Sequence, residues 1–145
     1  MLSLSSMTFF LLYLLSGFFL HLIWENAQAP LFAGFESFVQ HFPICLKATL
    51  TGDLSMMLLL YFVLALVHRD LQFLEKKETF RHPVTWILPS FVGALFAVII
   101  ELRALLEHRW SYTDAMPILP FFPVGLTPVL QMIVIPLVLL WILRW

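Results

Sequence analysis

Four long apolar stretches, separated by shorter polar ones, make up most of the chain; they cover residues 8–24, 48–67, 83–106 and 122–143. Each has close to the ~20 apolar residues that a helix needs to cross a hydrocarbon core of roughly 30 Å at about 1.5 Å per residue. A segment in lipid must satisfy its own backbone hydrogen bonds, which predicts helices. We therefore expect an all-α, polytopic membrane protein in which a single domain, residues 1–145, forms a four-transmembrane-helix bundle.

The connections between these stretches differ in character. Residues 25–47 contain five apolar side chains spaced like one face of a helix, which predicts a short interfacial helix on the outer leaflet. Residues 68–82 are rich in charge and predict a solvated loop. The connection before the fourth stretch contains three prolines and predicts irregular structure. The five apolar side chains are those of Leu31, Phe32, Phe35, Phe38 and Val39.

The composition identifies lipid as the solvent. Of 145 residues, 61% are hydrophobic and 12% charged, and the mean hydropathy is +0.95, whereas about a quarter of the residues in soluble domains are charged. The formal net charge of −1 argues against nucleic acid as a partner, because phosphate neutralisation needs a dense Lys/Arg surface. The single cysteine, Cys45, excludes an internal disulfide and a cysteine-based metal cluster.

The positive charges are divided unevenly between the two sides of the predicted bundle. Five Lys or Arg residues lie in loop 68–82 and at the C-terminus, against three on the other side. Because cytoplasmic loops carry the excess of Lys and Arg, both termini and loop 68–82 are predicted to be cytoplasmic, in a multi-pass protein of the inner (cytoplasmic) membrane of a bacterium. Trp24 and Trp110 then fall at the outer boundary, as in an aromatic belt.

The first apolar stretch could instead be a secretory signal, because Ala27, Gln28 and Ala29 resemble a cleavage site. Residues 1–7 carry no Lys or Arg, however, and His21 interrupts the apolar region. We therefore interpret residues 8–24 as a membrane span.

Each apolar stretch carries a polar side chain near the predicted outer side. Glu25 closes the first stretch, Asp53 lies inside the second, Glu101 is near the end of the third, and Gln131 is in the fourth. An antiparallel path brings all four to one side, which predicts a polar cluster. A carboxylate at the bilayer centre costs about 2.5–3.5 kcal/mol on insertion scales, so such groups usually face the bundle interior and have a function. This argument is strongest for Asp53.

Residue spacing extends this cluster. His21, Glu25 and Gln28 are separated by four and three residues, and they share one helical face if the first helix extends that far. Glu101 ends a stripe of small residues at four-residue spacing that begins at Gly93. Small residues allow a neighbouring helix to approach closely.

Each member of the cluster also has a simpler interpretation. Glu25 could end the first helix at the lipid headgroups, and Asp53 could cap the second helix if that helix begins beside it. Glu101 could belong to a run of exposed ion pairs, which stabilise little. Gln131 could only hydrogen-bond between helices, and His21 could be an interior histidine whose hydrogen bonds are satisfied.

The chain lacks the motifs of nucleophilic hydrolysis, nucleotide binding and zinc chemistry, so we expect neither a metal nor a cofactor. Carboxyl groups in an apolar pocket can transfer protons near neutral pH, and aromatic walls can stabilise a carbocation. We expect a pocket on the outer side that binds a membrane lipid or another hydrophobic small molecule and, if catalytic, performs proton-transfer isomerisation or cyclisation. The catalytic candidates are Asp53, Glu101 and Glu25. The candidates for substrate binding are His21, Gln28, Trp110, Tyr112 and Gln131.

Two other classes of function stay open at this point. A proton-coupled transporter would have to act as an oligomer, since four helices are few for transport. An accessory or assembly subunit of a larger membrane complex would use the stripe of small residues for contact with a partner protein.

Two stretches, HLIWENAQAPLF with TGDL and ELRALLEHRWSYTDAMPILPFFPVGLTPVLQ, resemble small, uncharacterised bacterial membrane proteins with four spans. This resemblance implies the architecture and no particular activity. At the level of fold alone, four spans with membrane carboxylates and aromatic residues are similar to the emopamil-binding-like isomerases and the small lycopene cyclases. No motif of either family matches residue by residue, so no functional residue is carried over.

Overall fold

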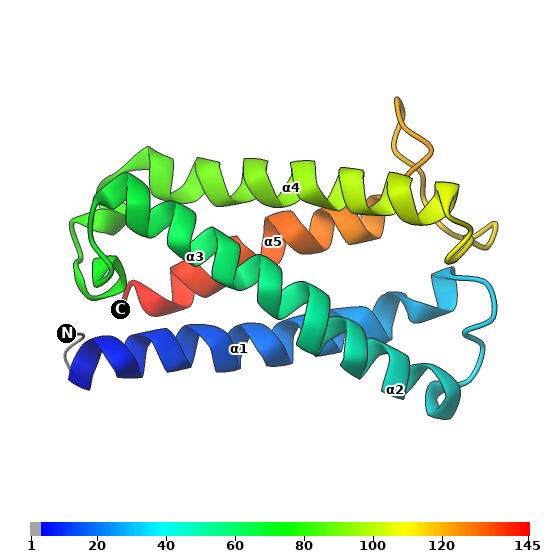
Figure 1. Ribbon diagram of the computed structural model, residues 1–145, viewed down its shortest axis with the longest axis horizontal. Coiled ribbons are helices and arrows are strands. Elements are labelled where there is room, and N and C mark those ends of the chain that lie inside the picture. Colours follow the sequence, from blue (N-terminus) through cyan, green and yellow to red (C-terminus); the bar gives the residue numbers. More distant parts are fainter. Residues whose placement is uncertain (1–3) are drawn as a thin grey trace.

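Helices account for most of residues 4–145, the part of the chain that the computed structural model describes (Figure 1). None of these residues lies in a β-strand, and two isolated bridges join loop segments. The α-helices are α1 (Leu4–Gln28), α2 (Phe38–Ala48), α3 (Leu54–His68), α4 (Pro83–Leu106) and α5 (Leu126–Leu143). Shorter helical segments are η1 (Ala29–Leu31), η2 (Thr49–Asp53), η3 (Phe73–Glu75) and η4 (Thr79–Arg81).

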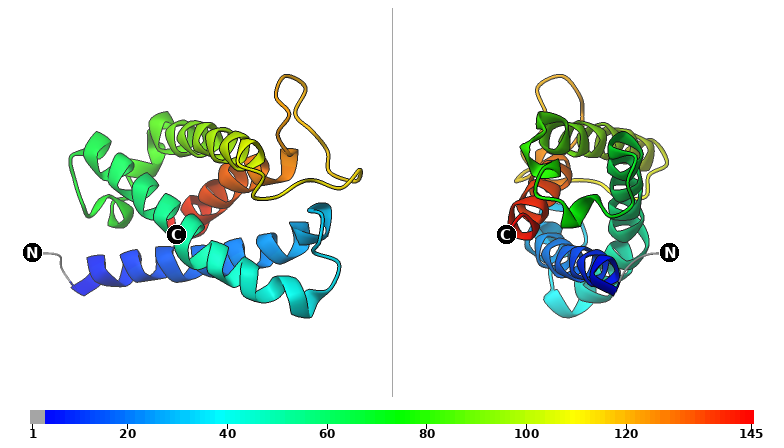
Figure 2. Two further views of the ribbon diagram at one scale, coloured as in Figure 1. Left: turned by 45° about the vertical axis from the view of Figure 1, so that its right-hand side comes forward. Right: turned by 90° about the vertical axis from the view of Figure 1, so that its left-hand side faces the viewer.

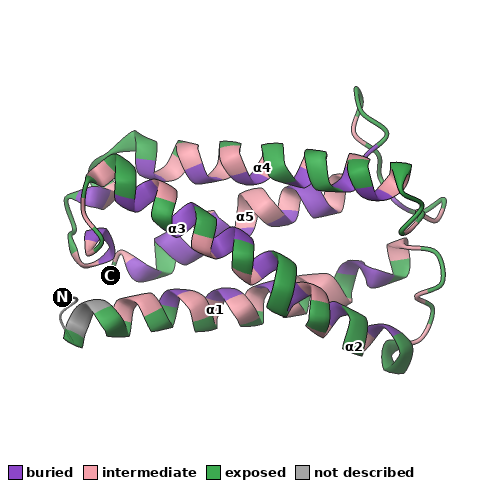
Figure 3. Cartoon of the chain, in the orientation of Figure 1, coloured by how far each residue is buried: buried purple, intermediate pink, exposed green. Residues whose placement is uncertain are grey.

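Four helical segments are long and apolar enough to cross a membrane: Met7–Leu31, Phe38–His68, Pro83–Leu106 and Leu126–Leu143. Large apolar side chains are exposed along the first three of them and at the C-terminal end of the fourth, at Trp141 and Ile142, while the buried residues face the bundle interior (Figure 3). This is the surface that lipid would cover. The all-α prediction is confirmed, and the four segments suggest a multi-pass membrane protein.

The second of these segments is one long helix in which α2, η2 and α3 follow each other without a break. Its 31 residues correspond to about 46 Å, which is longer than a hydrocarbon core of roughly 30 Å. The predicted short interfacial helix is not confirmed, because residues 32–37 are not helical and the helix that begins at Phe38 continues without a break to His68. The residues before it, Phe32 to Phe35, form a turn in which Gly34 has a φ of +86°.

Both the start of α1 and the end of α5 lie at one end of the bundle, beside the loop between α3 and α4 (Figure 1). We call this the terminal end, and the opposite end, with residues 29–37 and 107–125, the loop end. An apolar core fills the terminal half, and α3 packs against α4 there. The core is centred on Tyr13, Met57, Tyr61, Phe73 and Leu139.

The charge of the loop between α3 and α4 predicts a solvated loop, but part of this loop is buried. Phe73 and Leu74 are buried against the core, and the hydroxyl of Tyr61 donates to the carbonyl of Leu71. The charged side chains stay at the surface, where Lys76 lies beside Asp70 and lowers the pKa of that carboxyl. The loop therefore seals the terminal end of the bundle.

The two loops at the loop end bind one another through their backbones. The N–H of Ala33 donates to Ser111, and the N–H of Thr113 donates to Leu31, at 2.9 Å each. These bonds fix the segment after α4 over the end of α1. The rest of the second loop projects from the side of the bundle and is visible in all views (Figure 2). A bridge between Ile118 and Gly125 closes a hairpin in this loop. α5 begins after it, at Leu126 and not at residue 122.

The closest approach between helices joins α4 to α5 at Gly93. A Cβ atom on Gly93 would lie 2.3 Å from the backbone oxygen of Met132. Only glycine fits such a distance, so this member of the predicted small-residue stripe makes an intramolecular contact.

We therefore expect Gly93→Ala to lower the free energy of unfolding by about 1–3 kcal/mol, the usual range for an overpacked site. Gly52→Ala is the matched control, because a Cβ atom there would meet nothing within 4 Å. Reversible unfolding in mixed detergent micelles measures both variants. Equal stability of Gly93→Ala and the parent protein would contradict the close approach of α4 and α5.

Candidate functional site

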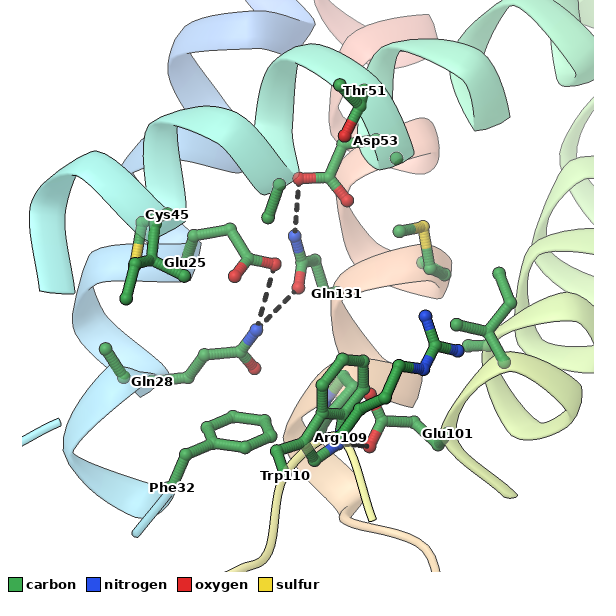
Figure 4. Close-up of a pocket in the computed structure, with 18 of the residues that line it drawn as sticks. Glu25, Gln28, Phe32, Cys45, Thr51, Asp53, Glu101, Arg109, Trp110 and Gln131 are labelled. Atoms are coloured by element: carbon green, nitrogen blue, oxygen red, sulfur yellow. Dashed lines mark hydrogen bonds between the residues drawn. The ribbon is translucent and has the colours of Figure 1, made fainter. Parts of the chain in front are cut away.

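A cavity of about 340 Å³ lies in the loop half of the bundle, between α1, the long second helix, α4 and α5 (Figure 4). Its wall combines apolar and polar side chains, and the single cysteine, Cys45, belongs to it. The polar or ionisable lining side chains are Glu25, Gln28, Thr51, Asp53, Glu101, Arg109 and Gln131. The larger apolar ones are Phe32, Phe35, Ile44, Met56, Ile100, Trp110 and Met132.

Gln131 of α5 is at the centre of a hydrogen-bond network that joins three parts of the bundle. Its Nε2 atom lies 2.9 Å from Nδ1 of His21 and 3.5 Å from Oδ2 of Asp53. Its Oε1 atom accepts a bond of 2.8 Å from Nε2 of Gln28, and the same Gln28 nitrogen donates to Glu25 at 3.2 Å (Figure 4). The network therefore connects α1, η2 and α5.

The partners of Gln28 fix the orientation of its side-chain amide. Its nitrogen lies between a carboxylate oxygen of Glu25 and the amide oxygen of Gln131, and both of these can only accept. Its own oxygen therefore has to point elsewhere. Gln28 is 5% exposed, and its Oε1 has no hydrogen-bond partner among the described residues. In Figure 4 this oxygen faces the part of the cavity beside Phe32.

His21 contacts Gln131 of this network but does not itself line the cavity. Its Nδ1 accepts from Gln131, so a neutral ring carries its proton on Nε2. Asp53 is the alternative partner of Nδ1 at 3.6 Å, and Nδ1 would have to carry a proton to donate to it. The shorter distance to Gln131 favours the arrangement in which Nδ1 accepts. His21 is therefore an interior histidine that contacts the polar cluster through Nδ1.

Asp53 is buried at the end of η2, which is a π-helical segment. Segments of this kind are rare inside α-helices and occur frequently at functional sites. The helix begins fifteen residues earlier, at Phe38, and the Asp53 side chain makes no capping bond. Asp53 is therefore not the start of the second helix. Glu25 likewise does not end the first helix, since α1 continues to Gln28.

Glu101 is held by two aromatic donors from the loop that follows α4. The indole N–H of Trp110 donates to its Oε2 at 3.2 Å, and the hydroxyl of Tyr112 donates to the same oxygen. Burial, together with this bond, raises the pKa of Tyr112 above its ordinary value, so the phenol keeps its proton. Glu101 is 6% exposed and is separate from the surface ion pair of Arg103 with Glu107.

Six of the eight predicted site residues line the cavity, and the other two support them. His21 contacts Gln131, and Tyr112 contacts Glu101, each from outside the cavity. The six lining residues are Glu25, Gln28, Asp53, Glu101, Trp110 and Gln131.

Arg109, Phe32 and Cys45 also line the cavity, and none of the three is among the site residues that the sequence predicts. The Arg109 guanidinium lies 5.4 Å above the Trp110 ring and is bound to Glu107 at 3.1 Å. The turn after α1 positions Phe32 in the cavity wall. Cys45 lies in α2, within residues 25–47, which the sequence predicts to be a connection. For Phe32, the regular spacing of apolar residues in 31–39 was the available sign that this segment packs against the rest of the protein.

No protein-family model matches the chain, and no curated protein or solved structure matches it either. Among residues 4–145, no group of three or more His, Cys, Asp or Glu side chains is placed to hold a metal ion. The side chains that line the cavity or contact its lining offer carboxyl, amide, indole, phenol, thiol and guanidinium groups.

The side chains of Gln28 and Gln131 should be energetically coupled through their hydrogen bond. We expect a double-mutant cycle with Gln28→Leu and Gln131→Leu to give an interaction free energy of roughly 0.6–1.7 kcal/mol, the range measured between membrane helices. Unfolding in mixed micelles supplies the four free energies. Thr8→Val is the control partner, because its hydroxyl bonds only within α1, to Leu4, and should combine additively with Gln131→Leu. Additivity of the two glutamine substitutions would contradict the network.

Proposed function

We propose that this chain is an intramembrane binding protein, or an enzyme of the same architecture, whose cavity takes up one lipid-like or hydrophobic small molecule from the outer leaflet of the inner (cytoplasmic) membrane. Both termini would lie in the cytoplasm, in agreement with the distribution of Lys and Arg. The observation that carries the proposal is that polar groups from all four spans border one cavity that also has a large apolar wall. Such mixed walls are typical of ligand sites.

The position of the cavity mouth supports entry from the side of the bundle. The exposed lining residues come from the long second helix, from α4 and from the loop after α4. α3 packs against α4 in the terminal half, whereas α2 and η2 diverge from α4 toward the loop end (Figures 1 and 2). A ligand could thus pass between η2 and α4 directly from lipid. The residues at this mouth are Ile44, Thr51, Gly52, Ile100 and Arg109.

The wall has a polar side and an apolar side, and together they would bind an amphiphile in one orientation. Glu25, Gln28, Asp53 and Gln131 form a continuous polar side, on which a head group would lie. Apolar side chains on the remaining wall, among them Met56, would contact its hydrocarbon part. Burial of that part supplies the affinity at about 25 cal/mol per Å².

The same groups would serve a proton-transfer reaction. Glu25 and Asp53 stand on the polar side, and Glu101 is held by Trp110 and Tyr112 on another side of the cavity. A bound molecule with a double bond between these carboxyl groups could receive a proton from one and lose a proton to another, which is isomerisation or cyclisation. The indole of Trp110 would lie beside the cationic intermediate.

The packing of the terminal half supports binding rather than transport. A proton-coupled transporter needs a polar path to both sides of the membrane. In this chain the half beyond the cavity is filled by the apolar core around Tyr61 and Leu139. Transport would therefore require a second copy or a different arrangement of the helices.

Filling the mouth of the cavity should prevent ligand uptake. Gly52→Phe introduces a ring where a Cβ atom meets nothing within 4 Å, so the helix should fold while the mouth is occupied. Native mass spectrometry of the protein extracted in mild detergent should show a bound lipid-like mass on the parent chain and about tenfold less on Gly52→Phe.

The matched control is Leu66→Phe, at a position that is 76% exposed on the terminal half of the same helix. It should retain the ligand of the parent chain. A parent chain that carries no such mass from any preparation, or a Gly52→Phe variant that retains it fully, would reject the proposed function.

A further inference from the structure

We propose that the head group bound in this cavity is a protonated primary or secondary amine that donates hydrogen bonds to Glu25, Asp53 and Oε1 of Gln28. The inference rests on the proposed function and specifies its ligand class. Three features of the polar wall support it: which atoms are free, which are already bonded, and how the charges balance.

The donors on the polar side of the wall are already engaged. Nε2 of Gln28 is shared between Glu25 and Gln131, and Nε2 of Gln131 lies beside His21 and Asp53. The hydroxyl of Thr51 and the indole of Trp110 are likewise engaged, with the carbonyl of Lys47 and with Glu101. A head group that needs donors, such as a phosphate or a carboxylate, would find few free ones on this side of the wall, because the remaining N–H groups of Arg109 belong to an exposed residue at the mouth.

The acceptors, in contrast, have spare capacity. Oε1 of Gln28 is buried and has no partner among the described residues. A carboxylate has about four lone-pair positions, and the bonds of Glu25 and Asp53 to the amides use one oxygen of each. A buried acceptor without a donor is destabilising, so a ligand N–H that reaches Gln28 replaces a missing interaction.

The charges point in the same direction. Three carboxyl groups line the cavity against one cation, Arg109, whose Nε lies 3.1 Å from Glu107, a residue outside the lining. A carboxylate in an apolar site needs a counter-charge. An ammonium group supplies both this charge and two or three donors, whereas a quaternary ammonium supplies the charge alone and an alcohol supplies the donor alone.

A panel of four probes with the same twelve-carbon chain separates these contributions. The probes are dodecylamine, dodecyltrimethylammonium, dodecanol and dodecanoate, each titrated in detergent micelles and read out by native mass spectrometry. The parent chain should bind the amine about tenfold more tightly than the alcohol or the trimethylammonium probe, and the carboxylate most weakly.

Two variants assign the contributions to residues. Gln28→Met should reduce the preference for the amine over the trimethylammonium probe about threefold or more, because only the amine can donate to Gln28. Glu25→Gln should reduce the preference for the amine over the alcohol. Each result is a ratio of two probes on the same variant, so a general loss of stability cancels.

Different failures have different meanings. If the four probes bind alike, or if dodecanoate binds as well as dodecylamine, the inference is wrong while the proposed function stands. An unchanged amine preference in both variants also overturns it. If no probe binds and the parent chain carries no lipid-like molecule, the proposed function fails with it.

Discussion

The architecture of the loop half depends on one constraint: a glutamine amide buried inside an apolar helical bundle has to find partners in the protein. Gln131 is 1% exposed and contacts side chains from α1 and η2. These contacts fix the amide between α5, η2 and α1, and α1 also packs directly on α5 and on η2. The loop half thus combines polar bonding at Gln131 with a small apolar cluster around Ala97, Val124 and Val129.

The cavity follows from the combination of these two kinds of contact. Gly93 brings α4 against the backbone of α5, so these two helices leave no space between them. The long second helix packs on α4 through α3 and then diverges, and its polar contact at Asp53 reaches α5 and not α4. The cavity therefore lies on the side where η2 and α4 diverge.

Much of the architecture could be predicted because lipid restricts the choices so strongly. Apolar length alone gives four helices, and their antiparallel order brings Glu25, Asp53, Glu101 and Gln131 toward one cavity. The residues at which the helices begin and end were less predictable. Aromatic spacing around Phe32 imitates a helical face, although Gly34 adopts a positive φ that ends regular structure there.

Other features depend on tertiary contacts that no local pattern encodes. The π-helical form of η2 and the placement of Arg109 beside the cavity follow from how the loops and helices meet. The division into lining and supporting residues is of the same kind. His21 and Glu25 share a helical face, yet only Glu25 reaches the cavity because Gln131 lies between His21 and the open space. The position of Cys45 has a practical consequence: it is the one thiol in the chain and is buried in the cavity wall, so the rate at which a small apolar thiol reagent modifies it would report how often this wall opens.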